Sequence, residues 1–122
     1  MKRSANFQKE RLSQPWKKLL RSAEMRASKK HVPFGLTAEW AKSHWTGVCE
    51  LTGIEFVLGQ RGPGPKSFSP SIDRIKPELG YVESNCRFVI WAVNAFKAEG
   101  DDDQMFRIAR ALLSYTKSPV SC

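Results

Sequence analysis

The chain has 122 residues and a mass of 13.8 kDa, enough for one domain with a modest core. This length excludes two-domain enzymes, doubly wound cofactor folds and (β/α)₈ barrels, all of which need more residues. Hydrophobic residues make up 41% of the chain and charged residues 26%, so a wholly disordered protein is also excluded.

The charge of the chain is strongly positive and unevenly distributed. Twenty Lys and Arg residues against twelve Asp and Glu residues give a net charge of +8. Residues 1–30 hold ten basic and two acidic side chains, so this segment accounts for the whole surplus. A basic segment joined to a neutral body is typical of proteins that bind polyanions. Nucleic acid is favoured as the partner over a merely solvated helix face.

Targeting signals and disulfides are not indicated. No apolar run approaches the ~20 residues that a membrane-spanning helix needs, and no apolar stretch follows the charged start. The three cysteines, Cys49, Cys86 and Cys122, include no close pair and fit a reduced compartment. We therefore expect a cytoplasmic protein without a membrane partner.

The first third of the chain is predicted to be helical. Apolar residues at three- and four-residue steps indicate a helix that begins at Ser13 or Gln14 and ends near Lys30. Residues 1–12 are then expected to form a basic arm or a short separate helix. Thr37 is expected to cap a second short helix.

The middle of the chain is predicted to be mostly irregular. Residues 49–58 are expected to form a short strand and turn. Glycines and prolines over residues 59–67 mark a surface loop, which Arg61 and Lys66 leave basic. A short strand is expected within residues 68–77.

The last third of the chain alternates between strand and helix. Residues 86–91 are the best strand candidate, with Trp91 expected in the core, and a helix over 92–99 follows directly. A last helix begins at Asp101 or Asp102 and is expected to pack its apolar face on the core. That face is formed by Met105, Ile108, Ala109, Leu112 and Leu113.

The segment from Asp73 to Asn94 reads as strand, loop, strand and helix in sequence. A hairpin with a helix laid across it can bring the Asp73 carboxylate and the Asn94 carboxamide to one point. Two oxygen donors suit a hard divalent ion such as Mg²⁺, which keeps several waters and takes other ligands from a phosphate. Asn85, at the junction of loop and strand, is expected to bind the loop backbone and fix the distance between the two donors.

At these residues the sequence resembles the HNH, or ββα-metal (His-Me finger), endonuclease superfamily, and most of all small phage or prophage HNH and endonuclease VII-like proteins. The motifs are Ser69-Pro70-Ser71-Ile72-Asp73-Arg74-Ile75, Gly80-Tyr81, Asn85 and Asn94-Ala95-Phe96-Lys97, within residues 16–113. The resemblance implies a small α+β domain with a ββα-metal core at 68–99, flanked by N-terminal helices and a C-terminal helix. Residues 1–30 are the basic arm and helix, and 31–122 the nuclease-like domain, with both in one globular unit.

The resemblance also implies roles for particular residues. Asp73 and Asn94 are the implied ligands of Mg²⁺ or Mn²⁺, and Asn85 organises the loop. Arg74 stands where the family has its first histidine, which deprotonates the attacking water. A guanidinium stays protonated up to about pH 12 and has no acceptor, so Arg74 cannot be a general base but can hold a phosphate. No structural zinc is expected, because Thr52 stands where a second zinc-binding cysteine would be.

Charge and resemblance together predict a metal-dependent endonuclease, encoded by a phage or prophage, that hydrolyses phosphodiester bonds of double-stranded DNA in the host cytoplasm. Its predicted catalytic residues are Asp73, Arg74, Asn85 and Asn94. The predicted nucleic-acid contacts are Lys17, Lys18, Arg21, Arg26, Lys29, Lys30, Arg61, Lys66, Arg74 and Lys97. One alternative is a nucleic-acid-binding protein that kept the scaffold and lost the chemistry at Arg74. Another is a phage-borne inhibitor or interaction protein whose basic arm meets an acidic protein.

Overall fold

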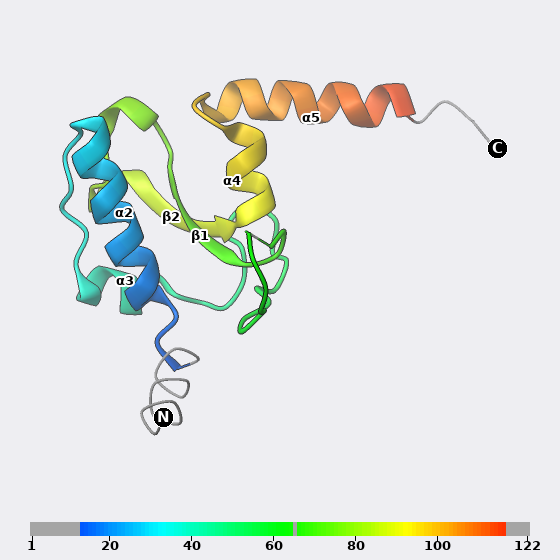
Figure 1. The fold of residues 1–122 in the computed structure, drawn as a ribbon. Helices are drawn as coiled ribbons and strands as arrows, with labels where there is room; N and C mark the ends of the chain where they lie inside the picture. Colours follow the sequence, from blue (N-terminus) through cyan, green and yellow to red (C-terminus); the bar gives the residue numbers. More distant parts are fainter. Residues whose placement is uncertain (1–12, 65, 117–122) are drawn as a thin grey trace.

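The computed structural model describes residues 13–64 and 66–116, so the expected arm at residues 1–12 and the terminal Cys122 lie outside the described part. The helices are α2 (Trp16–Lys30), α3 (Ala38–His44), α4 (Trp91–Lys97) and α5 (Asp102–Thr116), and the strands are β1 (Pro70–Arg74) and β2 (Cys86–Ile90). Short 3₁₀ turns span Pro77–Leu79 and Glu83–Asn85. The expected α+β class is confirmed (Figure 1). Within the described ranges, every helix is too short or too polar to cross a membrane.

β1 and β2 form an antiparallel hairpin in which Ile72 lies opposite Phe88 and Asp73 lies opposite Arg87. Residues that lie opposite each other point to the same face of a sheet, and neighbours along a strand point to opposite faces. One face is therefore apolar around Ile72 and Phe88, and the other is charged around Asp73 and Arg87. β2 runs directly into α4, which begins at Trp91, one residue earlier than predicted.

The main core lies between the apolar face of the hairpin and the helices α2 and α3 (Figure 1). Phe88 is fully buried, and its ring lies 5.3 Å from the ring of Trp40 and 5.2 Å from the ring of Trp45. Ala23 and Ala27, four residues apart on α2, are also buried. Their small side chains let the helix approach the sheet closely, which places Arg26 and Lys30 of α2 beside β1.

The connection between the strands depends on one close backbone approach. Gly80 has a φ of 80°, and a Cβ atom at this position would lie 2.7 Å from the carbonyl oxygen of Pro33. A glycine is therefore needed before Tyr81, whose backbone forms a bridge to Phe34. As predicted, the hydroxyl of Thr37 caps α3 by accepting a hydrogen bond from the backbone N–H of Trp40.

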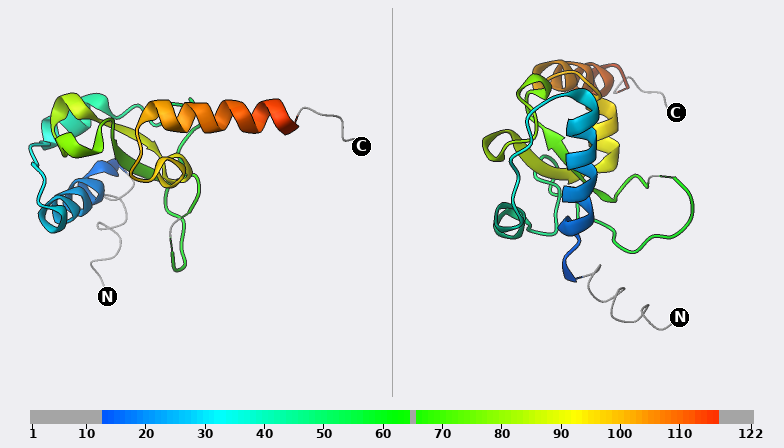
Figure 2. Two further views of the ribbon diagram at one scale, coloured as in Figure 1. Left: turned by 90° about the horizontal axis from the view of Figure 1, so that it is seen from above. Right: turned by 60° about the vertical axis from the view of Figure 1, so that its left-hand side comes forward.

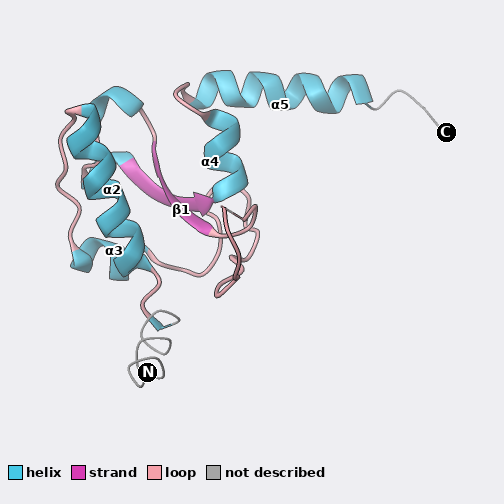
Figure 3. Ribbon diagram, viewed as in Figure 1, coloured by secondary structure: helices cyan, strands magenta, loops and turns pink. Residues whose placement is uncertain are grey.

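The segment predicted as a strand and turn at 49–58 is irregular apart from one bridge between Val48 and Glu55 (Figure 3). The backbone N–H of Glu50 donates to the carbonyl of Phe88, and the Glu50 carboxylate accepts from the N–H of Phe88. This segment therefore covers the outer edge of β2 with one backbone and one side-chain contact instead of a third strand.

The expectation that the last helix packs its apolar face on the core is wrong beyond its first turns. Met105 is buried, but Ile108, Leu112 and Leu113 are 50%, 54% and 68% exposed. Figures 1 and 2 show α5 extending away from the rest of the domain. The reason is the turn after α4, where Ala98 has a positive φ of 53° and redirects the chain.

We predict that Phe88→Ala lowers the free energy of unfolding by about 3–5 kcal/mol, because it leaves a cavity beside the rings of Trp40 and Trp45. Phe106→Ala, on the outward-directed α5, is the matched control and should cost about 1 kcal/mol or less. Urea unfolding followed by tryptophan fluorescence measures both values. Equal losses of unfolding free energy in the two variants would contradict the finding that α5 extends away from the core.

Candidate active site

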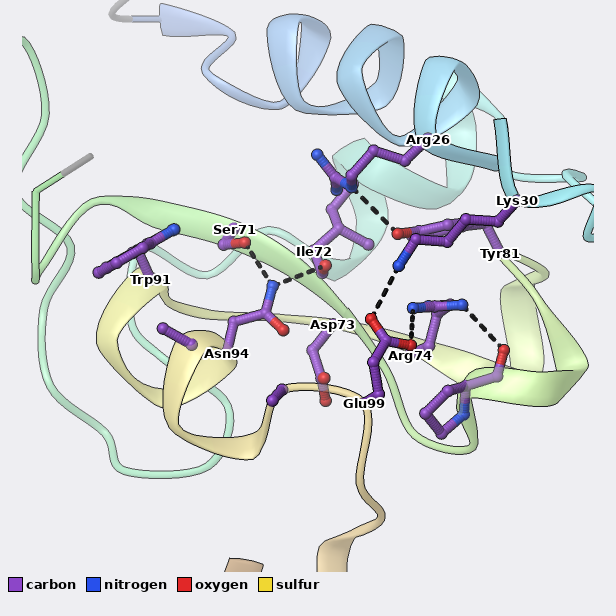
Figure 4. Close-up of a pocket in the computed structure, with 13 residues that line it drawn as sticks. Arg26, Lys30, Ser71, Ile72, Asp73, Arg74, Tyr81, Trp91, Asn94 and Glu99 are labelled. Carbon is purple, nitrogen blue, oxygen red and sulfur yellow. Dashed lines mark hydrogen bonds and ion pairs between the residues drawn. The ribbon is translucent and has the colours of Figure 1, made fainter. Parts of the chain in front are cut away.

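A cleft of about 270 Å³ lies between α2 and α4, at the edge of β1 that faces away from β2 (Figure 4). Because it lies at the edge of a strand, it receives side chains from both faces of the hairpin. Its lining consists of Arg26, Lys30, Ser71, Ile72, Asp73, Arg74, Pro77, Tyr81, Trp91, Asn94, Ala95, Ala98 and Glu99. Asp73, Arg74 and Asn94 thus share one cleft.

The Asp73 carboxylate is 3% exposed and is held through a single oxygen. Its Oδ2 atom accepts from Nε of Arg87 at 2.9 Å and from Nζ of Lys97 at 3.2 Å. Within the described part of the chain, Oδ1 receives no hydrogen bond. One acceptor oxygen of a fixed carboxylate is thus available to a ligand.

The Asn94 side chain, on α4, is anchored through its nitrogen. Nδ2 donates to Oγ of Ser71 at 2.7 Å and to the carbonyl of Ile72 at 3.2 Å. Its Oδ1 atom accepts no hydrogen bond from the residues that are described, and Figure 4 shows this oxygen on the side of the amide that faces Asp73. The cleft therefore presents two oxygen acceptors from two elements.

Asp73, Arg87, Lys97 and Asp102 form a cluster of two anions and two cations, the ion quartet, in which Asp73 and Lys97 are buried and Arg87 and Asp102 are partly buried. Oδ1 of Asp102 lies 2.7 Å from Nη2 of Arg87 and 3.0 Å from Nζ of Lys97. The Lys97 side chain is 1% exposed and also donates to the backbone carbonyls of residues 74 and 75. This corrects the expectation that Lys97 contacts a phosphate, because its ammonium is already surrounded by acceptors.

Arg74 projects to the opposite face of β1, toward α2. Its guanidinium lies 4.9 Å from the ring centroid of Tyr81 and donates to the carbonyl of Pro77 at 2.9 Å. Nη2 lies 3.4 Å from Oε1 of Glu99, and Oε2 of Glu99 lies 2.8 Å from Nζ of Lys30. A carboxylate thus joins two cations of the cleft that come from α2 and β1.

Three of the predicted nucleic-acid contacts line the cleft: Arg26, Lys30 and Arg74. Arg26 also donates from Nε to the hydroxyl of Tyr81 at 3.1 Å. The remaining exposed or half-buried candidates lie elsewhere on α2 or in the 59–67 loop and do not line the cleft: Lys17, Lys18, Arg21, Lys29, Arg61 and Lys66.

Asn85 lies outside the cleft, at the end of the 3₁₀ turn directly before β2. It is 4% exposed, and its Oδ1 atom accepts from the backbone N–H of Lys76 at 3.0 Å. Nδ2 donates to the carbonyls of Lys76 and Gly80 at 2.9 and 2.8 Å. These bonds tie the two ends of the connecting loop together next to Arg74.

Sequence reasoning missed Ser71 and Glu99 as residues of the cleft. Ser71 is two residues before Asp73 on a strand, so alternation was a usable signal for its position. Glu99 is the last residue of the predicted helix over 92–99, and nothing in its sequence context marks it. Trp91, expected in the core, lines the cleft and is 37% exposed because it begins α4 instead of ending β2.

The donor set of the cleft fits a hard divalent ion that keeps most of its own water. Three or more His, Cys, Asp or Glu side chains do not come together as a metal cluster anywhere in the described ranges. The available oxygens of Asp73 and Asn94 instead form a site with two protein ligands. Such a site suits Mg²⁺ or Mn²⁺, which takes its other ligands from water and a phosphate.

The fold is similar to that of a known nuclease. No family model and no curated protein matches the chain. Among solved structures, the rare-cutting HNH restriction endonuclease PacI matches with a TM-score of 0.57 and 18% identity, over 78% of this chain and 74% of PacI. The chain therefore shares its fold with an HNH restriction endonuclease, which confirms the expected fold.

We predict that Lys97→Met destabilises the fold by about 3–5 kcal/mol, because it leaves Asp73 buried without one of its two cations. The control Lys30→Met removes an ammonium from a largely exposed ion pair and should cost less than about 1 kcal/mol. Thermal and urea unfolding check both values. Equal costs would show that the ion quartet is not buried in solution.

Stability should also depend on the ionised form of Asp102. Burial raises the pKa of this carboxyl, but hydrogen bonds from Arg87 and Lys97 and their charges outweigh it, so its pKa lies below the ordinary 3.8. Because the folded-state pKa is depressed, the stabilisation is complete above 3.8 and is lost as pH falls through the lower folded-state value.

Asp102→Asn should therefore have a lower urea midpoint of unfolding than the parent at pH 7. The difference between the two midpoints should be smaller at pH 3. Asp103→Asn, an exposed neighbour on the same helix turn, controls for the change in net charge. The prediction would be contradicted if the difference in urea midpoint between the parent and Asp102→Asn were the same at both pH values.

Proposed function

We propose that this protein is a metal-dependent endonuclease that hydrolyses phosphodiester bonds in double-stranded DNA. The observation that carries the proposal is the pair of available oxygens, Asp73 Oδ1 and Asn94 Oδ1, in one cleft of an HNH endonuclease fold. PacI, which shares this fold, is a restriction endonuclease that perturbs DNA. The resemblance to phage and prophage proteins supports a phage or prophage origin, with action in the host cytoplasm.

Asp73 and Asn94 would hold Mg²⁺ or Mn²⁺. A bound divalent ion supplies Lewis acidity toward a phosphate and lowers the pKa of water. The protein's contribution is to fix its own ligands. Arg87 and Lys97 hold Oδ2 of Asp73, and Ser71 holds the Asn94 amide, so neither ligand must be ordered when the ion binds.

The cationic side of the cleft suits the phosphate of the substrate. Arg74 is fixed against Tyr81 and offers a planar guanidinium, while Arg26 and Lys30 extend the positive charge along α2. The exposed lysines and arginines elsewhere on α2 and in the 59–67 loop would contact neighbouring phosphates. Such contacts give affinity that falls with salt and carry little sequence information.

Water activation distinguishes this proposal from its nearest alternative. Neither His31 nor His44 lines the cleft, and Arg74 cannot accept a proton. Loss of a general base costs about 10²–10⁴-fold in rate, so an enzyme without one is slow and not necessarily inactive. A nucleic-acid-binding protein that has lost catalysis would keep the same charged cleft.

The test is nicking of supercoiled plasmid with Mg²⁺ or Mn²⁺ by the parent, Asp73→Asn and Asn94→Ala. We expect both variants to lose about 10²-fold or more in rate, because Asp73→Asn removes the negative charge that attracts the ion and Asn94→Ala removes the second oxygen of the donor pair. Asp103→Ala, which changes an exposed carboxylate outside the cleft, should keep the parental rate. Circular dichroism of each variant separates lost chemistry from lost folding.

The other outcomes decide between the alternatives. Tight binding of duplex DNA with no metal-dependent nicking by the parent would favour the non-catalytic binding protein. A failure to bind DNA even at low ionic strength would contradict both and favour an interaction with an acidic protein.

A further inference from the structure

Glu99 is an acidic residue at the cationic side of the cleft. Its carboxylate lies between Nζ of Lys30, at 2.8 Å from Oε2, and Nη2 of Arg74, at 3.4 Å from Oε1 (Figure 4). The two cations come from α2 and β1, which are far apart in the sequence. Each oxygen of the carboxylate thus meets one cationic donor, which is also how two non-bridging oxygens of a phosphodiester are bound.

The backbone before Glu99 has an unusual conformation. Ala98 has φ 53° and ψ −128°, a region that residues other than glycine rarely adopt. Its N–H still donates to the carbonyl of Asn94 at 3.0 Å, so the turn is attached to the end of α4. Strained residues of this kind gather at functional sites, and this one directs Glu99 back over the cleft.

The contacts of Glu99 differ from those of Asp73 in their exposure to water. The side chains of Glu99 and Lys30 are 69% and 40% exposed, whereas those of Asp73 and Lys97 are 3% and 1% exposed. Arg74, the second partner of Glu99, is 9% exposed, and its contact with the carboxylate is the longer of the two, at 3.4 Å. Exposed ion pairs are weak and screened by salt, so another anion can compete for them. Glu99 is therefore exchangeable, while Asp73 is fixed.

The charge of Glu99 opposes a second anion in the cleft. Hydrogen bonding to Lys30, against a smaller effect of burial, lowers the pKa of this carboxyl from 4.5, so it is ionised at neutral pH. A phosphate that approaches Lys30 and Arg74 meets this negative charge first. The phosphate can bind both cations only if the Glu99 carboxylate turns outward. The Glu99 side chain is exposed, so it has room to turn.

We propose that Lys30 and Arg74 form a phosphodiester-binding site and that Glu99 occupies this site until a nucleic-acid phosphate displaces it. The inference rests on the nucleic-acid binding proposed above and adds a competing internal anion to it. Glu99 weakens binding of any single phosphate, and a polyanion overcomes this competition through its further contacts with α2.

The experiment measures binding of a fluorescently labelled DNA duplex by anisotropy in EDTA, over a series of salt concentrations. Glu99→Gln keeps the size of the side chain and removes its charge. Glu55→Gln makes the same change in net charge at an exposed position outside the cleft and serves as the matched control.

We expect Glu99→Gln to bind about two- to fivefold more tightly than Glu55→Gln at low salt, the size of one exposed ion pair. Its log–log salt slope should match that of Glu55→Gln, because Lys30 and Arg74 contact the phosphate in both complexes once Glu99 is displaced. Adding Lys30→Gln should cost more affinity in the Glu99→Gln background than in the parent, since only there is the ammonium unpaired before binding.

The outcomes separate the two proposals. If the parent binds DNA and Glu99→Gln binds no more tightly than Glu55→Gln, the displacement of Glu99 is overturned and the nucleic-acid function stands. Weaker binding by Glu99→Gln overturns it as well. If the parent binds no DNA at low salt, the proposed function fails and this inference fails with it.

Discussion

The ion quartet is the interaction on which the cleft depends. An isolated buried charge is strongly unfavourable, so the two carboxylates and two cations of Asp73, Arg87, Lys97 and Asp102 are stable only together. They come from β1, β2, α4 and α5 in turn, so satisfying all four charges fixes how the hairpin and the two helices meet. The same contacts bind one oxygen of Asp73 and leave the other toward the cleft. Stability and site geometry therefore have a single cause.

Burial divides the ion pairs of this small domain into two kinds. Where water is excluded, as around Lys97, a lost partner leaves an uncompensated charge, and the pair behaves as a fixed part of the fold. Where water reaches both groups, as around Glu99 and Lys30, screening makes the pair easy to exchange. The rigid pairs lie on the α4 side of β1 and the exchangeable pair on the α2 side. The cleft thus has a fixed ligand side and an adaptable cationic side.

Local features of the fold follow from the sequence, whereas long-range partners do not. The hairpin, α4 and the Thr37 cap are predicted because each depends on neighbouring residues, such as the alternation along β2. The burial of Lys97 is not, because lysine is almost always exposed and its acceptors belong to β1 and α5. The direction of α5 was also not predicted from the sequence. Its apolar pattern is a property of the helix alone, and the positive φ that turns the chain occurs at Ala98, a residue type that gives no signal for it.

The position of Arg74 separates the proposed phosphate binding from the proposed hydrolysis. Asp73 and Arg74 are neighbours on a strand and point to opposite faces, yet both reach the cleft because it lies at the strand edge. Asp73 contributes an oxygen acceptor on the side of α4, and Arg74 contributes a cation on the side of α2. Replacing a base by a guanidinium at position 74 removes a proton acceptor but increases the attraction for a phosphate. In the proposed enzyme, attraction for a phosphate therefore does not depend on how water is activated, and only water activation requires a residue other than Arg74.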